Sequence, residues 1–147
     1  MTTMTAQATQ VYSIFIKASP EQIWEAITTP EFTHRYFFGT HVRVAADAYQ
    51  SVDGAGNGMI EGSVSEYEPP RRLVHTWLAL YDPDQAAEQA SRVTWEIEPR
   101  DDGTSLLTVV HDQLEGAPKT AESVAGGWMY VLSGLKTLLE TGKPLVG

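Results

Sequence analysis

The chain has 147 residues, a formal net charge of −9 and no cysteine. This length suits a single domain with a core that is stable without cross-links, and the lack of cysteine excludes disulfides, thiolate metal sites and cysteine nucleophiles. The negative charge disfavours nucleic acid as a partner because an acidic surface repels phosphates, and the cysteine-free composition fits a cytoplasmic location.

The chain opens with nine polar residues that lack a hydrophobic period. We therefore expect a flexible tail at 1–9 and a single domain at 10–147. The tail has neither the basic start nor the apolar stretch of a signal peptide. No apolar run approaches the roughly 18 residues of a membrane span, so we expect no membrane span.

Residues 10–18 are rich in β-branched and aromatic side chains and predict a first strand. Ser19, followed by a proline, predicts the N-cap of a short helix that ends near residue 29. A second short helix is predicted from about Pro30 to Tyr36.

Five more strands are expected further along the chain, at 41–45, 59–68, 72–81, 91–98 and 104–113. The glycine-rich residues 48–58 predict a loop or wide hairpin turn, and residues 82–89 predict a loop with room for one helical turn. Because consecutive strands are joined by turns, the sheet is predicted to be antiparallel.

The long helical pattern lies at 119–142, with Thr120 as the expected cap. Apolar side chains recur there every three or four residues, at Val124, Trp128, Val131, Leu135 and Leu138. An isolated helix of this length is marginal in water, so its apolar face must pack on the sheet. The predicted class is α+β, with about six antiparallel strands, two short helices after the first strand and one long C-terminal helix.

Three segments of the chain resemble a known family. They are the strand-to-helix segment 14–27, the Glu-Pro-Pro-Arg-Arg segment within 66–77, and the Gly-Trp and leucine pattern of 127–142. Their order and spacing resemble the SRPBCC (START-like, helix-grip) superfamily. Within it, the chain is most similar to the branch named after the activator of the heat-shock-protein-90 ATPase. The resemblance covers roughly residues 10–142.

This resemblance implies a curved antiparallel sheet wrapped around the C-terminal helix, with an apolar cavity between them. Members of the superfamily use that cavity for lipids, polyketides, plant hormones and other hydrophobic molecules, and some are cyclases or hydrolases. We therefore expect a small hydrophobic ligand. The sequence contains no metal-binding or cofactor motif, so we expect neither a metal nor a cofactor.

Aromatic residues are the first candidates for the cavity. Trp77, Trp95 and Trp128 either pack in the core or form the wall of a pocket for a flat ligand. Tyr36, Phe37 and Phe38 follow the short helices, where this fold has its cavity mouth, and either form an entrance or pack in the core.

Two histidines are candidates for chemistry. Strand parity places His111 on the same face as Val109, and His75 on the same face as Trp77. The pair could point into the cavity for acid–base work or ligand orientation, or both could be hydrogen-bonded or surface histidines. His111 and Asp112 cannot form a dyad, because successive side chains on a strand face opposite ways.

Glycines interrupt the long helix at Gly126, Gly127 and Gly134. The missing side chains either leave space for a ligand or let the helix approach its neighbours closely. We expect the site near residues 127–131 and a structural role for the C-terminal leucines.

The sequence thus predicts a binding protein for a small hydrophobic molecule. The predicted ligand-binding residues are Tyr36, Phe38, His75, Trp77, Trp95, Val109, His111, Gly127, Trp128 and Val131. A second hypothesis is a cyclase- or hydrolase-type enzyme in which His75 or His111 transfers a proton on a polyketide-like or aromatic substrate. A third is an interaction domain, either associated with a chaperone or paired with a second copy as a homodimer.

Overall fold

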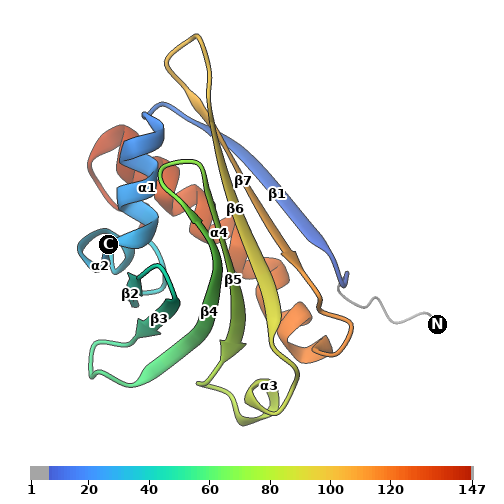
Figure 1. Ribbon diagram of the computed structural model, residues 1–147. Helices are drawn as coiled ribbons and strands as arrows, with labels where there is room; N and C mark the ends of the chain where they lie inside the picture. Colours follow the sequence, from blue (N-terminus) through green and yellow to red (C-terminus); the bar gives the residue numbers. More distant parts are fainter. Residues whose placement is uncertain (1–6, 147) are drawn as a thin grey trace, which may run out of the picture.

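The computed structural model describes residues 7–146, which form a curved seven-stranded sheet with a long helix across its concave face (Figure 1). The strands are β1 (Gln10–Ile16), β2 (His41–Val44), β3 (Ala48–Val52), β4 (Gly58–Glu68), β5 (Arg72–Ala79), β6 (Ser91–Pro99) and β7 (Ser105–Asp112). The helices are α1 (Pro20–Thr28), α2 (Pro30–Thr33), α3 (Pro83–Ala86) and α4 (Pro118–Thr141).

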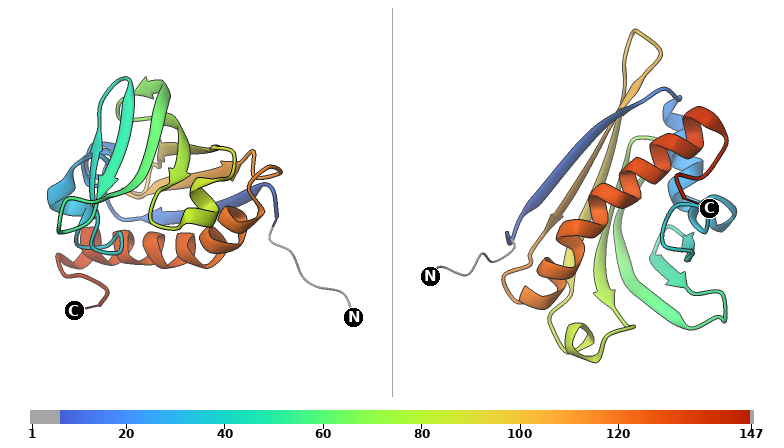
Figure 2. Two further views of the ribbon diagram at one scale, coloured as in Figure 1. Left: turned by 90° about the horizontal axis from the view of Figure 1, so that it is seen from below. Right: turned by 180° about the vertical axis from the view of Figure 1, so that it is seen from behind.

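The strands are ordered β1-β7-β6-β5-β4-β3-β2, and every neighbouring pair is antiparallel. Because β1 and β2 form opposite edges, α1 and α2 carry the chain from one edge of the sheet to the other. Figure 2 shows α4 lying along one side of the arched sheet. The predicted α+β helix-grip fold is confirmed.

Alternating side chains define the concave face. In β6, Val93, Trp95 and Ile97 are buried as the period of two requires. The register of β5, β6 and β7 places His75 beside Val93 and Val93 beside His111. The two histidines are therefore separated by a single strand, on the face that α4 covers.

The predicted start of α1 is confirmed. The Ser19 hydroxyl accepts a hydrogen bond from the Gln22 amide at 3.2 Å, and the Gln22 side chain accepts one from the Ser19 amide at 2.9 Å. This reciprocal capping box satisfies amides that the first helical turn leaves without partners.

The apolar stripe of α4 is buried as predicted, but its cap differs. The helix begins at Pro118 after Ala117, and no side chain of the N-cap residue caps it. The Glu88 carboxylate instead accepts hydrogen bonds from the amides of Lys119 at 2.8 Å and Thr120 at 2.9 Å. The predicted cap at Thr120 is therefore wrong, because a carboxylate from a distant loop takes that role at the positive end of the helix dipole.

The segment predicted as a loop at 48–58 begins with a strand, so the sheet has seven strands rather than about six. In β3, Tyr49 and Ser51 face inward while Gln50 faces out, and the strand pairs with both β2 and β4. Because the segment is largely polar and glycine-rich, the sequence did not indicate this alternation. The turn itself lies at 53–57, where the Asp53 carboxylate accepts hydrogen bonds from two backbone amides.

The second short helix ends at Thr33, earlier than the predicted Tyr36. The chain then turns, and Phe38 and Gly39 both have positive φ angles, of 52° and 73°. This conformation is uncommon for a residue with a side chain, and it sets the direction in which the Phe38 ring projects.

Residues 1–6 of the predicted tail lie outside the described residues, so the tail remains a prediction. Within residues 7–146, no helix combines the length and the apolar character that crossing a membrane requires.

Candidate functional site

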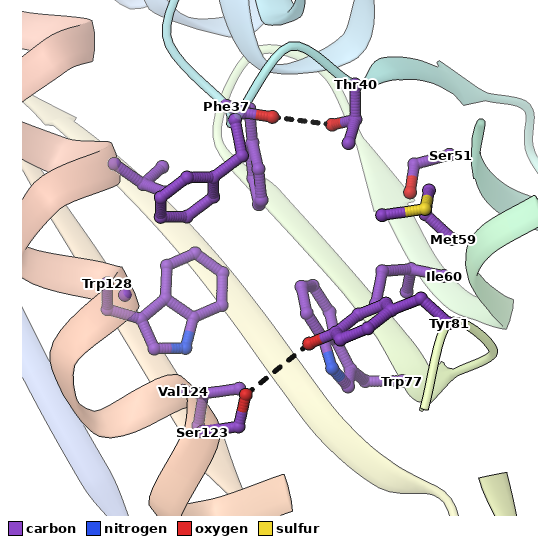
Figure 3. A pocket seen from close by; sticks show the side chains of 13 residues that line it. Phe37, Thr40, Ser51, Met59, Ile60, Trp77, Tyr81, Ser123, Val124 and Trp128 are labelled. Carbon is purple, nitrogen blue, oxygen red and sulfur yellow. Dashed lines mark hydrogen bonds between the residues drawn. The ribbon is translucent and has the colours of Figure 1, made fainter. Parts of the chain in front are cut away.

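An apolar cavity of about 340 Å³ lies between the N-terminal half of α4 and the concave face of the sheet (Figure 3). Helix α4 contributes Ser123, Val124, Gly127, Trp128 and Val131. The loop after α2 contributes Phe37, Phe38 and Thr40, and the sheet side contributes Ser51, Met59, Ile60, Trp77 and Tyr81.

Three aromatic rings form one continuous part of the wall. The ring centroids of Trp77 and Trp128 are 5.6 Å apart, and that of Phe37 lies 6.4 Å from Trp77 and 6.0 Å from Trp128. The rings meet at tilted or edge-on angles except for Phe37 and Trp77, which stack. Such a wall offers both faces and edges of rings to a flat apolar molecule.

The glycines of α4 have different surroundings. A Cβ at Gly127 would lie 3.8 Å from the Phe38 ring, at the cavity, whereas a Cβ at Gly126 would meet open space. A Cβ at Gly134 would lie only 3.1 Å from the Tyr36 Cβ. Gly127 therefore leaves room at the cavity, and Gly134 allows the helix to approach the loop after α2 closely.

Exposed aromatic side chains border the cavity. The Phe38 ring is 61% exposed and stacks on Tyr130, with centroids 5.5 Å apart and an interplanar angle of 12°. At another part of the border, the Tyr81 hydroxyl lies 3.4 Å from the Ser123 Oγ, a contact that joins the end of β5 to α4 (Figure 3). Side chains as exposed as Phe38 and Tyr81 have room to move when a ligand enters.

Two residues that line the cavity each have a buried side-chain atom without a hydrogen-bond partner, the Ser51 Oγ and the Trp77 Nε1. The Thr40 hydroxyl, by contrast, donates to the Phe37 carbonyl at 2.7 Å. A buried polar atom without a partner costs free energy, and most such atoms in proteins are paired.

His75 lies behind the wall, fully buried. Its Nε2 accepts a hydrogen bond from the Trp95 Nε1–H at 3.0 Å, so its Nδ1 carries the proton and donates to the Thr76 carbonyl at 2.8 Å. The imidazole stacks on the Tyr49 ring at 3.8 Å. Burial lowers the pKa of His75 to about 4, because the charged form would lose its hydration.

His111 is also hydrogen-bonded at both ring nitrogens, and one of its partners lies on α4. Its Nδ1 accepts from the Trp128 Nε1–H at 3.0 Å, and its Nε2–H donates to the Ser91 Oγ at 2.7 Å. Burial, and secondarily the neighbouring His75, lower the pKa of His111 to about 3, against an opposing effect of Asp112. Both ring nitrogens of each histidine are thus occupied, and both imidazoles are neutral near pH 7.

The structure brings five of the predicted ligand-binding residues to the cavity wall: Phe38, Trp77, Gly127, Trp128 and Val131. The other five lie in the core outside that wall: Tyr36, His75, Trp95, Val109 and His111. The Tyr36 hydroxyl, for example, donates to the Ala26 carbonyl at 2.7 Å. A role for any of the ten in ligand binding remains a prediction.

Sequence reasoning missed the part of the wall that comes from β3 and β4. Ser51 lies in the segment predicted as a loop, and Met59 and Ile60 begin a strand with many exposed acidic residues. The alternation of Tyr49 and Ser51 was the available signal. In residues 7–146, no group of three or more His, Asp or Glu side chains is arranged to hold a metal ion.

Solved structures share this fold. The protein MLL2253 from Mesorhizobium loti is 24% identical, covers 90% of this chain and 96% of its own, and has a TM-score of 0.71. DynU16, from the dynemicin biosynthetic locus, is 22% identical over 94% of this chain, with a TM-score of 0.74. This chain covers 49% of the DynU16 chain, about half its length.

A third structure, an HSP90 activator from Plasmodium falciparum, is 19% identical over 94% of this chain and 99% of its own, with a TM-score of 0.72. Identities at this level establish a common fold. Curated proteins give no match. Residues 17–140 match the family described as activator of Hsp90 ATPase homolog 1-like protein, and this chain belongs to that family.

Proposed function

We propose that this protein binds a small hydrophobic molecule in the cavity between α4 and the sheet. The observation that carries the proposal is a cavity of about 340 Å³ with a largely apolar, aromatic wall. Small-molecule sites are typically clefts of this kind, with few polar groups.

The expected affinity follows from the area that the ligand buries. A flat molecule of two or three rings that buries about 200 Å² of apolar surface gains about 5 kcal/mol, and its own loss of freedom opposes this gain. A gain of about 5 kcal/mol corresponds to a dissociation constant of about 0.2 mM, so a purely apolar probe should bind no more tightly than that.

The enzyme hypothesis has weaker support. Both ring nitrogens of His75 and of His111 are hydrogen-bonded to other residues of the protein, and neither histidine lines the cavity. A general base must reach the proton it removes. Proton transfer by either histidine would first require a Trp–His hydrogen bond to break.

Chaperone association and homodimer formation would involve the outer surface of the protein rather than the cavity. Activation of HSP90 is stated for the Plasmodium falciparum structure, and the shared fold supports it here only by analogy. Sedimentation of the purified protein, alone and with a chaperone of the HSP90 class, would test both hypotheses together.

Two neighbouring glycines give a matched test of the cavity. In Gly127→Leu the new side chain enters the cavity, whereas in Gly126→Leu it points into open space. Both changes replace a helical glycine, so their effects on helix propensity are alike. The measurement is the ligand-induced rise in melting temperature across a panel of neutral aromatic compounds.

Wild type and Gly126→Leu should show the same rise with the same compounds, and Gly127→Leu should show none. Binding that survives unchanged in Gly127→Leu would place the ligand elsewhere and refute the cavity as its site.

A further inference from the structure

The two unpartnered atoms in the cavity wall, the Trp77 Nε1 and the Ser51 Oγ, define what the ligand must offer. Trp77 is 5% exposed and Ser51 3% exposed, so neither atom is open to bulk solvent. A buried donor or acceptor without a partner costs free energy, and a ligand that supplies the partner recovers it. The following inference rests on the proposed function and deepens it.

The remaining polar side chains of the wall have partners already. The Thr40 hydroxyl donates within its own turn, and the hydroxyls of Tyr81 and Ser123 face each other. Among the described residues that line the cavity, the buried side-chain groups without a partner are thus the N–H of Trp77 and the hydroxyl of Ser51.

Sheet register separates these two positions. Ser51 pairs with Ile60, Ile60 pairs with Ala79, and Trp77 lies two residues before Ala79 on the same face. Two strand spacings correspond to about 10 Å between the backbones of β3 and β5. A ligand that meets both groups therefore carries polar atoms at two separate points of its rim, with the apolar body over Ile60 between them.

Charge excludes one large class of hydrophobic molecules. Among the described residues that line the cavity there is no Asp, Glu, Lys, Arg or His, and the protein as a whole has a net charge of −9. A carboxylate in this cavity would be desolvated without a counter-charge. Fatty acids and aromatic acids in their ionised form are therefore poor ligands.

We infer that the ligand is an uncharged aromatic molecule with a carbonyl-type oxygen that accepts the Trp77 Nε1–H, and a second polar atom that meets the Ser51 hydroxyl. Neighbouring side chains cover both atoms in the free protein, so these side chains must move before a ligand can reach the atoms. Met59, whose flexible thioether chain also lines the cavity (Figure 3), provides such freedom.

Three probes of nearly equal shape test this inference. 2-Acetylnaphthalene carries a carbonyl acceptor, 2-isopropylnaphthalene lacks it, and 2-naphthoate replaces it with an anion. Dissociation constants are measured by calorimetry for wild type at about pH 7.5, where the naphthoate is ionised. Wild type should bind the ketone about tenfold more tightly than the hydrocarbon, since one neutral hydrogen bond is formed, and should bind the anion least.

Two variants test whether Trp77 and Ser51 make the hydrogen bonds to the ligand. Trp77→Phe keeps an aromatic ring but removes the N–H, and Ser51→Ala removes the hydroxyl. Trp24→Phe and Ser63→Ala make the same chemical changes at residues outside the cavity wall. The preference for the ketone should disappear in Trp77→Phe and persist in both controls. For 6-hydroxy-2-acetylnaphthalene, which adds a second polar atom, affinity should also fall in Ser51→Ala.

The possible failures are distinguishable. If wild type binds none of the naphthalenes, the proposed function fails, and this inference with it. If the hydrocarbon and the ketone bind equally, or the preference survives in Trp77→Phe, a hydrophobic site exists but the acceptor inference is overturned. Tightest binding of 2-naphthoate also overturns it, because an anion would then be the favoured ligand.

Discussion

The concave face of the sheet has two regions that treat buried polar groups differently. On β5 to β7, His75 and His111 accept hydrogen bonds from the indole N–H groups of Trp95 on β6 and Trp128 on α4, and the other ring nitrogen of each histidine is also hydrogen-bonded. On β3 to β5, next to the cavity, Trp77 and Ser51 have no partner for the indole N–H and the hydroxyl.

Whether a buried polar group has a hydrogen-bond partner therefore distinguishes a structural residue from a candidate binding residue better than the residue type does. Buried polar groups that are fully paired fix one arrangement of the core, because every departure leaves a donor or acceptor unsatisfied. Unpaired groups around an empty volume have a cost in the free protein that a ligand can remove. His75 and His111, which the sequence suggests as catalytic candidates, belong to the paired region. Trp77 and Ser51 belong to the region without partners.

The largest expected effect comes from removing the side chain that connects the two regions. Trp128→Ala should lower the free energy of unfolding by about 3–5 kcal/mol, because the indole is buried, packs on three aromatic rings and donates to His111. Urea unfolding followed by circular dichroism measures this loss. A loss below about 1 kcal/mol would contradict the central place of this residue in the core.

Acid should weaken the paired region next. His75 and His111 have pKa values lowered to about 4 and 3 in the folded protein, so the unfolded chain, with histidine pKa values near 6.5, binds more protons below about pH 6.5. Stability from their neutral forms is complete above about pH 6.5 and is lost as pH falls toward the folded values.

Each histidine changes the free energy of unfolding by at most about 1.4 kcal/mol per pH unit, so together they should remove about 2–4 kcal/mol between about pH 7 and pH 5. Urea titrations at several pH values measure the slope. Imidazole NMR signals provide a direct check, since neither histidine should titrate above about pH 5 in the folded protein. A buried imidazole that titrates like a free histidine would contradict the assignment.

A matched pair of substitutions compares the two regions directly. Trp95→Phe leaves the His75 Nε2 without its donor, whereas Trp77→Phe removes an N–H that had no partner. Both changes lose the same volume. Trp95→Phe should therefore be more destabilising by about 1–3 kcal/mol. Equal losses in urea unfolding would mean that the Trp95–His75 hydrogen bond adds nothing to stability.

The smallest expected effects come from the glycines of α4. Gly126→Ala should stabilise the protein by about 0.5–1 kcal/mol, because its Cβ meets open space in a helix. Gly134→Ala should destabilise it by about 1 kcal/mol, because the added Cβ would lie 3.1 Å from Tyr36. Melting temperatures of the two variants should shift in opposite directions, and a shared direction would contradict the close approach at Gly134.

Much of the fold was predictable because burial imposes a period on the sequence. The stripe Val124, Trp128, Val131 predicted the buried face of α4, and the alternation of Val93, Trp95 and Ile97 predicted β6. Strand β3 was not predictable in this way, because its short polar sequence depends on pairing with β2 and β4 for its conformation.

The cavity could be predicted only in part. Strand parity correctly places His75 and His111 on the buried face of the sheet, but parity does not say which side chains on that face are covered by others. The Trp128 indole reaches across to His111, so the imidazole lies in the core while the indole lines the wall. Whether a side chain on the buried face reaches the cavity or is covered by another side chain depends on packing between distant residues.

The close spacing of the indoles also has an optical consequence. The Trp128 ring centroid lies 5.3 Å from that of Trp95 and 5.6 Å from that of Trp77, so the transition dipoles of three of the four tryptophans couple to one another. Such coupling depends steeply on the angles between the rings. The ultraviolet circular dichroism of the protein should therefore contain a coupled band that a molecule entering the cavity perturbs, and that Trp128→Phe abolishes. Circular dichroism of these tryptophans should therefore detect ligand entry without an added label.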